Sequence, residues 1–163
     1  HSLVGPVEAF TEPLPPIFYW LSPFWVRTDD TPTTALPELN TLADAARVTF
    51  NYDAIWAFLT PQRRDWFYAM LCAVLDYPKS HRQIIIVDSG ENTAQWIALL
   101  TMALPHQHRA MLTFATYHHD PYTVPFLVTG TTLDSNFRFM AEELLTIILI
   151  LKRSCLMIPG LFL

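Results

Sequence analysis

The fold of this chain is decided by residues 83–117, QIIIVDSGENTAQWIALLTMALPHQHRAMLTFATY. The stretch contains four consecutive β-branched apolar residues, Ile84–Val87, a pattern typical of a strand that is buried on both faces. Asp88 and Ser89 end this strand, and either of them or Asn92 can cap the helix that follows.

The helix expected over residues 92–104 has one apolar face, built from Trp96, Ile97, Leu100, Ala103 and Leu104. Pro105 ends it, and residues 112–117 then alternate apolar and hydroxyl-bearing side chains, as a second strand does. A strand, a crossover helix and a strand make a βαβ unit. We therefore expect the two strands to be parallel neighbours or near-neighbours, with Trp96 buried between the helix and the sheet.

The rest of the chain adds helices and one more strand to this unit. A short helix is expected over residues 52–59, and a longer one over 61–76, because Thr60-Pro61 is a helix start and an apolar stripe follows it: Trp66, Phe67, Met70, Leu71, Val74 and Leu75. A third strand is expected over residues 126–129, and another alternating piece over 133–140. The predicted fold class is α/β, with a mixed sheet of strands near 84–88, 112–117 and 126–129 and helices near 52–59, 61–76 and 92–104.

Three regions differ in composition. Residues 1–40 are aromatic and rich in proline, so an extended segment with short strand pieces is expected there, followed by an α/β domain over 41–143. Residues 144–163 form an apolar tail without a clear period. This tail is either a native strand or helix or a frameshifted or truncated end; we favour the second, which predicts a peripheral position. The first residue is His1, so an internal fragment and a tag remnant both remain open.

The composition argues against several classes of function. The net charge of −5 and the scattered basic residues argue against a nucleic-acid surface. Neither the proline-interrupted stretch 10–26 nor residues 144–151 can make a membrane helix. The two cysteines do not make a disulfide framework, and Cys72 is expected to be a small core residue, so a reducing cytoplasm is the expected compartment.

Catalytic and metal-binding patterns are weak. The candidate metal ligands are His81, His106, His108, His118 and His119. In a βαβ unit the 106–108 and 118–119 pairs lie at opposite ends of a strand, about 20 Å apart, and cannot share one metal ion. Ser89 follows a parallel strand, where ligands bind in α/β folds, but it lacks a nucleophile-elbow motif and a partner His. Four glycines give no phosphate-binding loop, so we expect no cofactor and no GTP binding by the isolated chain.

Five motifs occur in order along residues 1–140: His1-Ser2-Leu3-Val4; Leu14-Pro15-Pro16…Trp20…Ser22-Pro23-Phe24-Trp25; Trp96-Ile97-Ala98…Leu104-Pro105; Leu112-Thr113-Phe114-Ala115-Thr116-Tyr117; and Gly130-Thr131-Thr132. This ordered set resembles the bacterial GTPase-associated proteins of multi-gene conflict or signalling systems, in their N-terminal and adjoining domains. The resemblance implies that a β-rich segment precedes His1, so that residues 1–40 include the end of a preceding domain. It also implies work beside a separately encoded GTPase.

Two function classes follow. The favoured one is a non-enzymatic module that docks a partner protein such as a GTPase; the candidate partner-binding residues are Trp20, Phe24, Trp25, His118, His119 and Asp120. A homo-oligomer is also compatible with the sequence. The alternative is a hydrolase or metal-dependent enzyme, with a site near Asp88 and Ser89 or at the His118–His119 turn.

Overall fold

The computed structural model describes residues 15–22, 51–138 and 146–150 of the chain. Its contacts divide the chain into two compact units, His1–Ala54 and Ile55–Leu163, so that the boundary falls inside the helix α3 (Tyr52–Phe58). Each unit is described by itself below. The predicted helix over 39–48 and the motif at residues 1–4 lie outside the described residues.

In the first unit, the described residues contain one complete element and the first turn of α3. The 3-10 helix η1 (Pro16–Tyr19) buries Ile17, Phe18 and Tyr19. The ring of Phe18 lies 5.9 Å from that of Tyr52, centroid to centroid. A single-turn helix therefore stands where short strand pieces were expected, because Pro15-Pro16 presets the backbone dihedral that begins a helical turn.

The second unit is an α/β sheet structure, as predicted. Strand β1 (Gln83–Val87) lies between β3 (Val128–Thr131) and β4 (Thr146–Ile150), and β2 (Phe114–Ala115) lies beyond β3, in the order β2-β3-β1-β4. All of these pairings are parallel, so the expectation of a mixed sheet is wrong for the part of the chain that the structure describes. The first and second predicted strands are parallel near-neighbours, separated only by β3.

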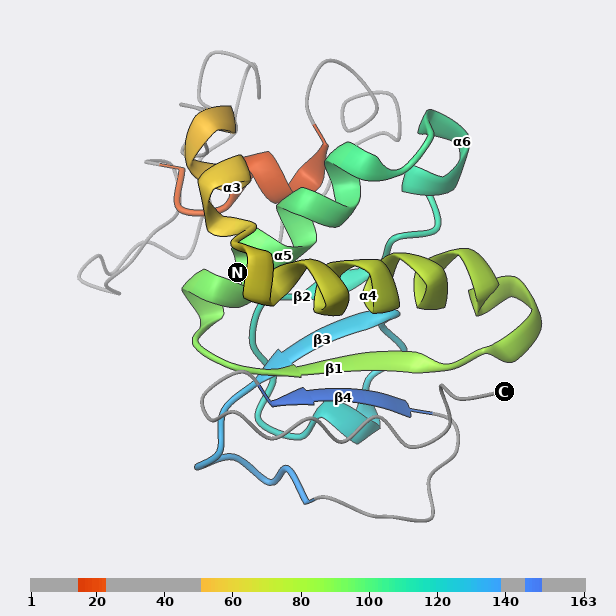
Figure 1. Cartoon of the computed structure of the whole chain (residues 1–163). Helices are drawn as coiled ribbons and strands as arrows, with labels where there is room; N and C mark the ends of the chain where they lie inside the picture. Colours follow the sequence, from red (N-terminus) through yellow and green to blue (C-terminus); the bar gives the residue numbers. More distant parts are fainter. Residues whose placement is uncertain (1–14, 23–50, 139–145, 151–163) are drawn as a thin grey trace, which may run out of the picture. The chain divides into compact units, whose positions relative to one another are not determined.

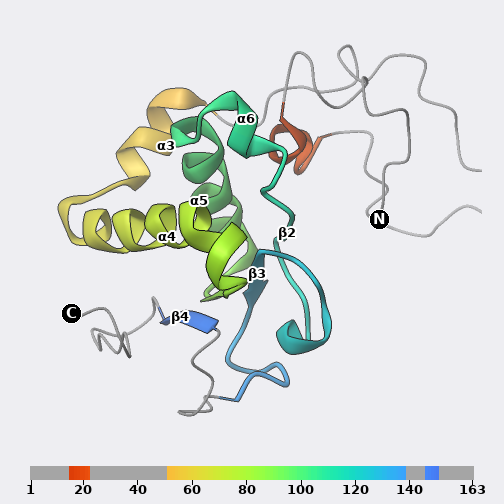
Figure 2. The ribbon, with the colours of Figure 1, turned by 90° about the vertical axis from the view of Figure 1, so that its right-hand side faces the viewer.

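Helices α4 (Pro61–Ser80) and α5 (Gly90–Ala103) lie on the same face of this sheet, as Figures 1 and 2 show. Helix α4 starts with Pro61 after Thr60, as predicted, but continues past the expected end at residue 76 and includes Pro78 in its last turn. His81, in the left-handed region with φ 52°, closes it. In α5, Ser89 is the cap: its hydroxyl accepts a hydrogen bond from the backbone N–H of Asn92.

The core has two layers because β1 is apolar on both faces. Ile85 and Val87 pack with Phe137 and Tyr122 on one face, where Tyr122 belongs to the 3-10 helix η2 (Pro121–Thr123). Since side chains alternate along a strand, Ile84 and Ile86 point to the other face, which α4 and α5 cover. All four of these β1 side chains are buried.

Several local predictions need correction. The third strand begins two residues later than expected, at Val128, and ends at Thr131. Residues 133–138 form a turn followed by irregular backbone instead of an alternating strand, and the rest of that piece lies outside the described residues. The turn expected at residues 106–108 is a short helix, α6 (His106–Arg109), with Pro105 before it.

Strand β4 lies inside the apolar tail. It pairs with β1 over five residues, Gln83↔Thr146 to Val87↔Ile150, at one edge of the sheet. Of the two alternatives for the tail, a strand of the fold accounts for residues 146–150, whereas residues 151–163 lie outside the described part.

Within the described residues, no helix is long and apolar enough to cross a membrane.

We expect Trp96→Ala to lower the free energy of unfolding by about 3–5 kcal/mol, because Trp96 is 0% exposed and its ring meets that of Phe58 edge-on at 5.0 Å. Urea denaturation measures the change. The matched control is Trp56→Ala on α3, where the ring is 51% exposed and the expected change is within about 0.5 kcal/mol. Equal losses in the two variants would contradict the assignment of Trp96 to the core.

Deleting residues 152–163 should leave the melting temperature nearly unchanged, because β4 stays whole. Deleting residues 146–163 should lower it by more than about 4–8 °C, because the pairing of β4 with β1 is then lost. Calorimetry of the two truncated chains decides the matter. A comparable drop in the shorter deletion would show that residues 152–163 belong to the core.

Candidate functional site

The carboxyl edge of the sheet is the first candidate site. Because the strands are parallel, their carboxyl ends meet at this edge: Asp88 follows β1, Thr132 follows β3, and His118 comes soon after β2. The chain leaves β1 toward α5 on the helix face, whereas it leaves β3 toward Phe137, which packs on the opposite face. Neighbouring strands whose connections diverge in this way form the position at which α/β folds bind ligands.

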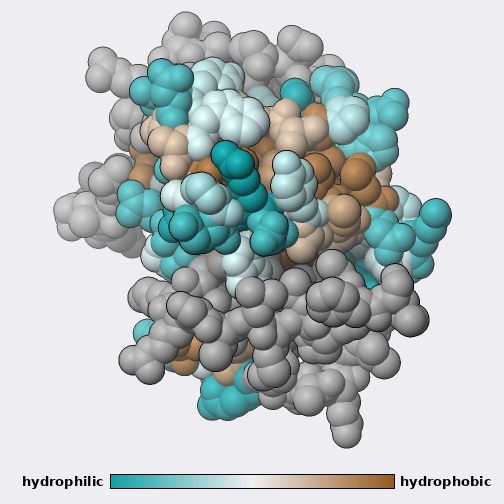
Figure 3. Space-filling view, viewed as in Figure 1, coloured by the Kyte–Doolittle hydropathy of each residue, from teal (hydrophilic) through white to brown (hydrophobic). Residues whose placement is uncertain are grey.

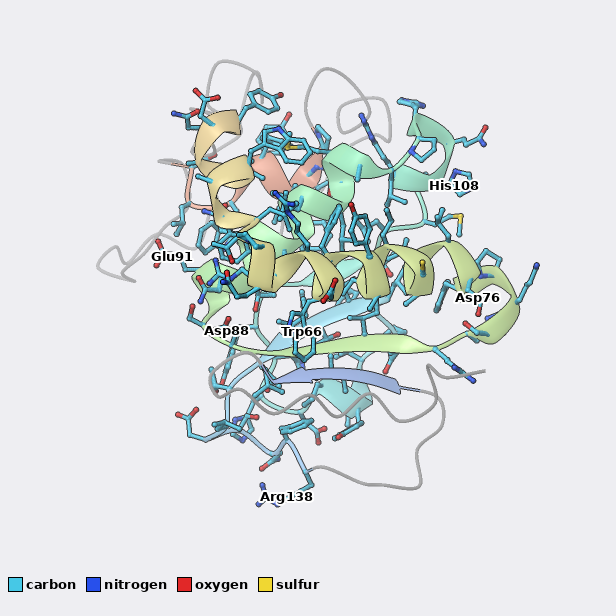
Figure 4. All side chains as sticks on the ribbon, in the orientation of Figure 1. Trp66, Asp76, Asp88, Glu91, His108 and Arg138 are labelled. Atoms are coloured by element: carbon cyan, nitrogen blue, oxygen red, sulfur yellow. The ribbon has the colours of Figure 1, made fainter. Side chains whose placement is uncertain are left out.

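Asp88 is 6% exposed, and its carboxylate is engaged by the start of α5 (Figure 4). Oδ1 accepts hydrogen bonds from the Ser89 backbone N–H at 2.7 Å and from the Asn92 side-chain amide at 3.0 Å. Oδ2 accepts from the same amide at 3.0 Å. The carboxylate thus compensates the free N–H groups and the positive end of the helix dipole, which is a structural role. The Ser89 hydroxyl is also used, since it accepts from the Asn92 backbone N–H at 3.2 Å.

The turn after β2 is held by the last two residues of β3. The backbone N–H of His118 donates to the Gly130 carbonyl at 2.8 Å, and the Thr131 hydroxyl donates to the His118 carbonyl at 2.9 Å. The ring atom Nδ1 of His118 lies 2.8 Å from the carbonyl oxygen of Asp120, two residues further on. Asp120 in turn caps η2 by accepting from the Tyr122 backbone N–H. His118 and Asp120 therefore shape the turn, while the side chain of His119 is exposed.

The structure gives no hydrogen bond between Asp88 or Ser89 and the His118–Asp120 turn. Among the described residues, no three His, Cys, Asp or Glu side chains lie close enough to hold a metal ion. The remaining candidate ligands are separated along the fold: His81 closes α4, and His106 and His108 lie in α6.

A close approach between α5, β2 and β3 shapes this edge. A Cβ atom at Gly130 would overlap the carbonyl oxygen of Thr116 and lie 2.6 Å from Cγ2 of Thr93. Only glycine lets β3 pass under the first turns of α5 at this point. At Gly90, by contrast, a Cβ would lie 3.6 Å from the same Thr116 oxygen, which is an ordinary contact.

The second candidate is the outer side of α4, where two residues that were expected in the core are exposed. Tyr68 is 59% exposed, Leu75 is 46% exposed, and Cys72 between them is exposed as well. The expectation that Cys72 and Leu75 belong to the core is therefore wrong. Helix α4 carries two apolar stripes, and the one that includes Phe67, Met70 and Val74 faces inward. Figure 3 shows brown hydrophobic surface over the middle of α4 and toward its C-terminal end, with teal surface on either side.

The signal for this stripe is present in the sequence. Tyr68, Cys72 and Leu75 have the spacing i, i+4, i+7, which places them on one side of a helix. Apolar residues in excess of one stripe indicate a second apolar face. Trp66, which is half-buried, extends from α4 on the side of the sheet (Figure 4).

Of the candidate partner-binding residues, Trp20 lies just after η1 and is half-buried, and Phe24 and Trp25 lie outside the described residues. His118, His119 and Asp120 lie together in the turn after β2. Their role in binding stays a prediction.

The model of a protein family, GTPase-associated protein 1, middle domain, matches residues 54–144, which is more than half of the chain. The chain belongs to the GTPase-associated protein 1 family. The match begins at Ala54, where the contacts place the boundary between the two units. In this family member the match covers α4, the parallel strands β1, β2 and β3, and α5.

No curated protein matches the chain, and no solved structure does. The resemblance to GTPase-associated proteins is confirmed by the family match alone.

Gly130→Ala should destabilise the protein by about 1–3 kcal/mol, because the new methyl group has to displace backbone at Thr116. Gly90→Ala is the matched control in the same region, and it should be neutral or stabilising by up to about 1 kcal/mol, since alanine is the better helix former at the start of α5. Urea denaturation of both variants measures this. A neutral Gly130→Ala would contradict the close approach of β3 to the Thr116 carbonyl.

Proposed function

We propose that this chain is a non-enzymatic interaction module of a bacterial GTPase-associated conflict or signalling system, and that it docks a partner protein, for which a separately encoded GTPase is the first candidate. The observation that carries the proposal is the exposed apolar stripe Tyr68–Cys72–Leu75 on α4. These residues lie on one side of a helix. When a partner covers them, the removal of their apolar surface from water lowers the free energy of the complex.

The state of the carboxyl edge supports the same proposal. The side chains that could begin a reaction there, Asp88 and Ser89, already make the hydrogen bonds that start α5. A general base or nucleophile needs a free lone pair within reach of a substrate and a partner that activates it. Among the described residues, neither Asp88 nor Ser89 is hydrogen-bonded to a histidine that could activate it, so their contacts with the start of α5 favour a structural role. The exposed His119 beside the carboxyl edge would be a second contact for the partner.

The family description names a GTPase, whereas the chain has no phosphate-binding loop. We therefore expect the isolated, nucleotide-free chain not to bind fluorescently labelled GTP in the micromolar range and not to hydrolyse GTP. Fluorescence anisotropy and phosphate release measure the two properties. Saturable binding with micromolar affinity would overturn this expectation.

The partner is tested directly with the GTPase encoded nearest to the gene of this chain. Isothermal titration with the GTPase in its GDP-bound and GTP-bound forms should give a saturable heat signal, and light scattering of the free chain reports whether it self-associates. Leu75→Ser should weaken binding at least fivefold without changing the fold, because Leu75 is exposed. Leu133→Ser is the matched control, since Leu133 is exposed outside α4. No binding by the unaltered chain would contradict the GTPase as partner.

A further inference from the structure

The exposed stripe on α4 has an acidic flank. At about 100° per residue, Tyr68, Cys72 and Leu75 fall within an arc of about 60°. Asp65 and Asp76 are both exposed and are eleven residues apart, so they project in nearly the same direction, about 20° from each other. They lie along one side of the stripe, and Figure 4 shows Asp76 near the C-terminal end of the helix. These five residues are called the α4 outer face below.

The charges around this face are arranged unevenly. Neither Asp65 nor Asp76 makes an ion pair with another residue of the described part of the chain. Two basic residues are exposed nearby: Arg64 lies on the opposite flank in the first turns, and Lys79 follows the stripe beyond Leu75. One long side of the apolar stripe is therefore purely acidic. A partner that covers the stripe therefore places some of its side chains next to the carboxylates of Asp65 and Asp76.

We infer that the α4 outer face binds an amphipathic helix of the partner protein, whose apolar stripe carries lysine or arginine on the side that meets Asp65 and Asp76. A helix laid along α4 buries the stripe by side-chain interdigitation, and residues that flank such a seam select partners by charge. This inference rests on the proposed function for the existence of a partner protein, and it adds the surface and the chemistry of the contact.

A second copy of this chain fits the face less well. In a two-fold symmetric pair of antiparallel helices the same flank of each helix meets its equivalent. Asp65 of one copy would then lie beside Asp76 of the other, twice, and the repulsion of these unpaired carboxylates opposes the association. A partner helix with lysine or arginine on its flank is instead attracted to Asp65 and Asp76.

Cys72 allows a test that does not need the natural partner. It is exposed in the middle of the stripe, and Cys155→Ser leaves it as the only cysteine of the full chain. Two synthetic peptides serve as probes: both are amphipathic helices with leucines at i, i+4 and i+7 and a central cysteine, and they differ only in lysine or glutamate on the flank. In a thiol–disulfide redox buffer, the equilibrium fraction of peptide joined to Cys72 reports how well each peptide fits the face.

The lysine peptide should form the adduct with an equilibrium constant about five- to tenfold larger than the glutamate peptide at low salt, and the ratio should approach one near 1 M salt. The double variant Asp65→Lys/Asp76→Lys should invert the preference. The double variant Asp53→Lys/Glu91→Lys has the same change in net charge at exposed positions outside α4, and it should keep the original preference. Thermal unfolding checks that both variants are folded.

Three results overturn the inference: equal adducts with both peptides, the same preference in the Asp65→Lys/Asp76→Lys variant, or a Cys72-linked dimer of the chain that outcompetes both peptides. Binding of the GTPase tests the proposed function separately from the peptide experiment. If the peptides follow the charges but the GTPase does not bind, the α4 outer face stands and the GTPase is the wrong partner. If the GTPase binds the unaltered chain and the Asp65→Lys/Asp76→Lys variant equally, the partner stands and the surface is wrong.

Discussion

Strand β1 has to bury β-branched side chains on both faces at once, and the rest of the second unit is arranged to make this possible. It is paired on both sides, with β3 and β4, so its backbone groups are satisfied without water. Helices α4 and α5 cover one face, while Phe137 and Tyr122 cover the other. A strand of this composition is typical of the interior of a parallel sheet.

The same constraint explains why the carboxyl edge is rich in polar groups that bond to each other. Where β1 ends, α5 must begin at once to cover the sheet, and its free N–H groups are met by Asp88 and Ser89. Where β3 ends, the hydroxyl groups of Thr131 and Ser135 share a hydrogen bond of 2.7 Å. This bond holds the turn that leads the chain toward Phe137 on the opposite face of the sheet. At the edge that often holds ligands in α/β folds, these polar groups hold the sheet and its connections together.

The segment 83–105 could be predicted because local preference and burial agree there: a β-branched run predicts β1, a capping serine predicts the start of α5, and Pro105 predicts its end. Beyond it the prediction was poorer, since a short helix replaces the turn at 106–108 and the strand expected over 112–117 is only Phe114–Ala115. The order of the strands could not be predicted, because β3 enters between β1 and β2 through long-range pairing. The need for Gly130 depends on Thr93 and Thr116, which are distant in sequence. The site on α4 was missed because a helix with two apolar stripes does not itself say which one faces inward.

The position of β4 has a consequence for the order of folding. Its partner β1 is synthesised some sixty residues earlier, so during translation the sheet order is incomplete and one side of β1 has unpaired N–H and C=O groups. An apolar strand with an open edge is a template for pairing with other chains. Until residues 146–150 have been synthesised, β1 therefore has an open edge at which another chain can pair.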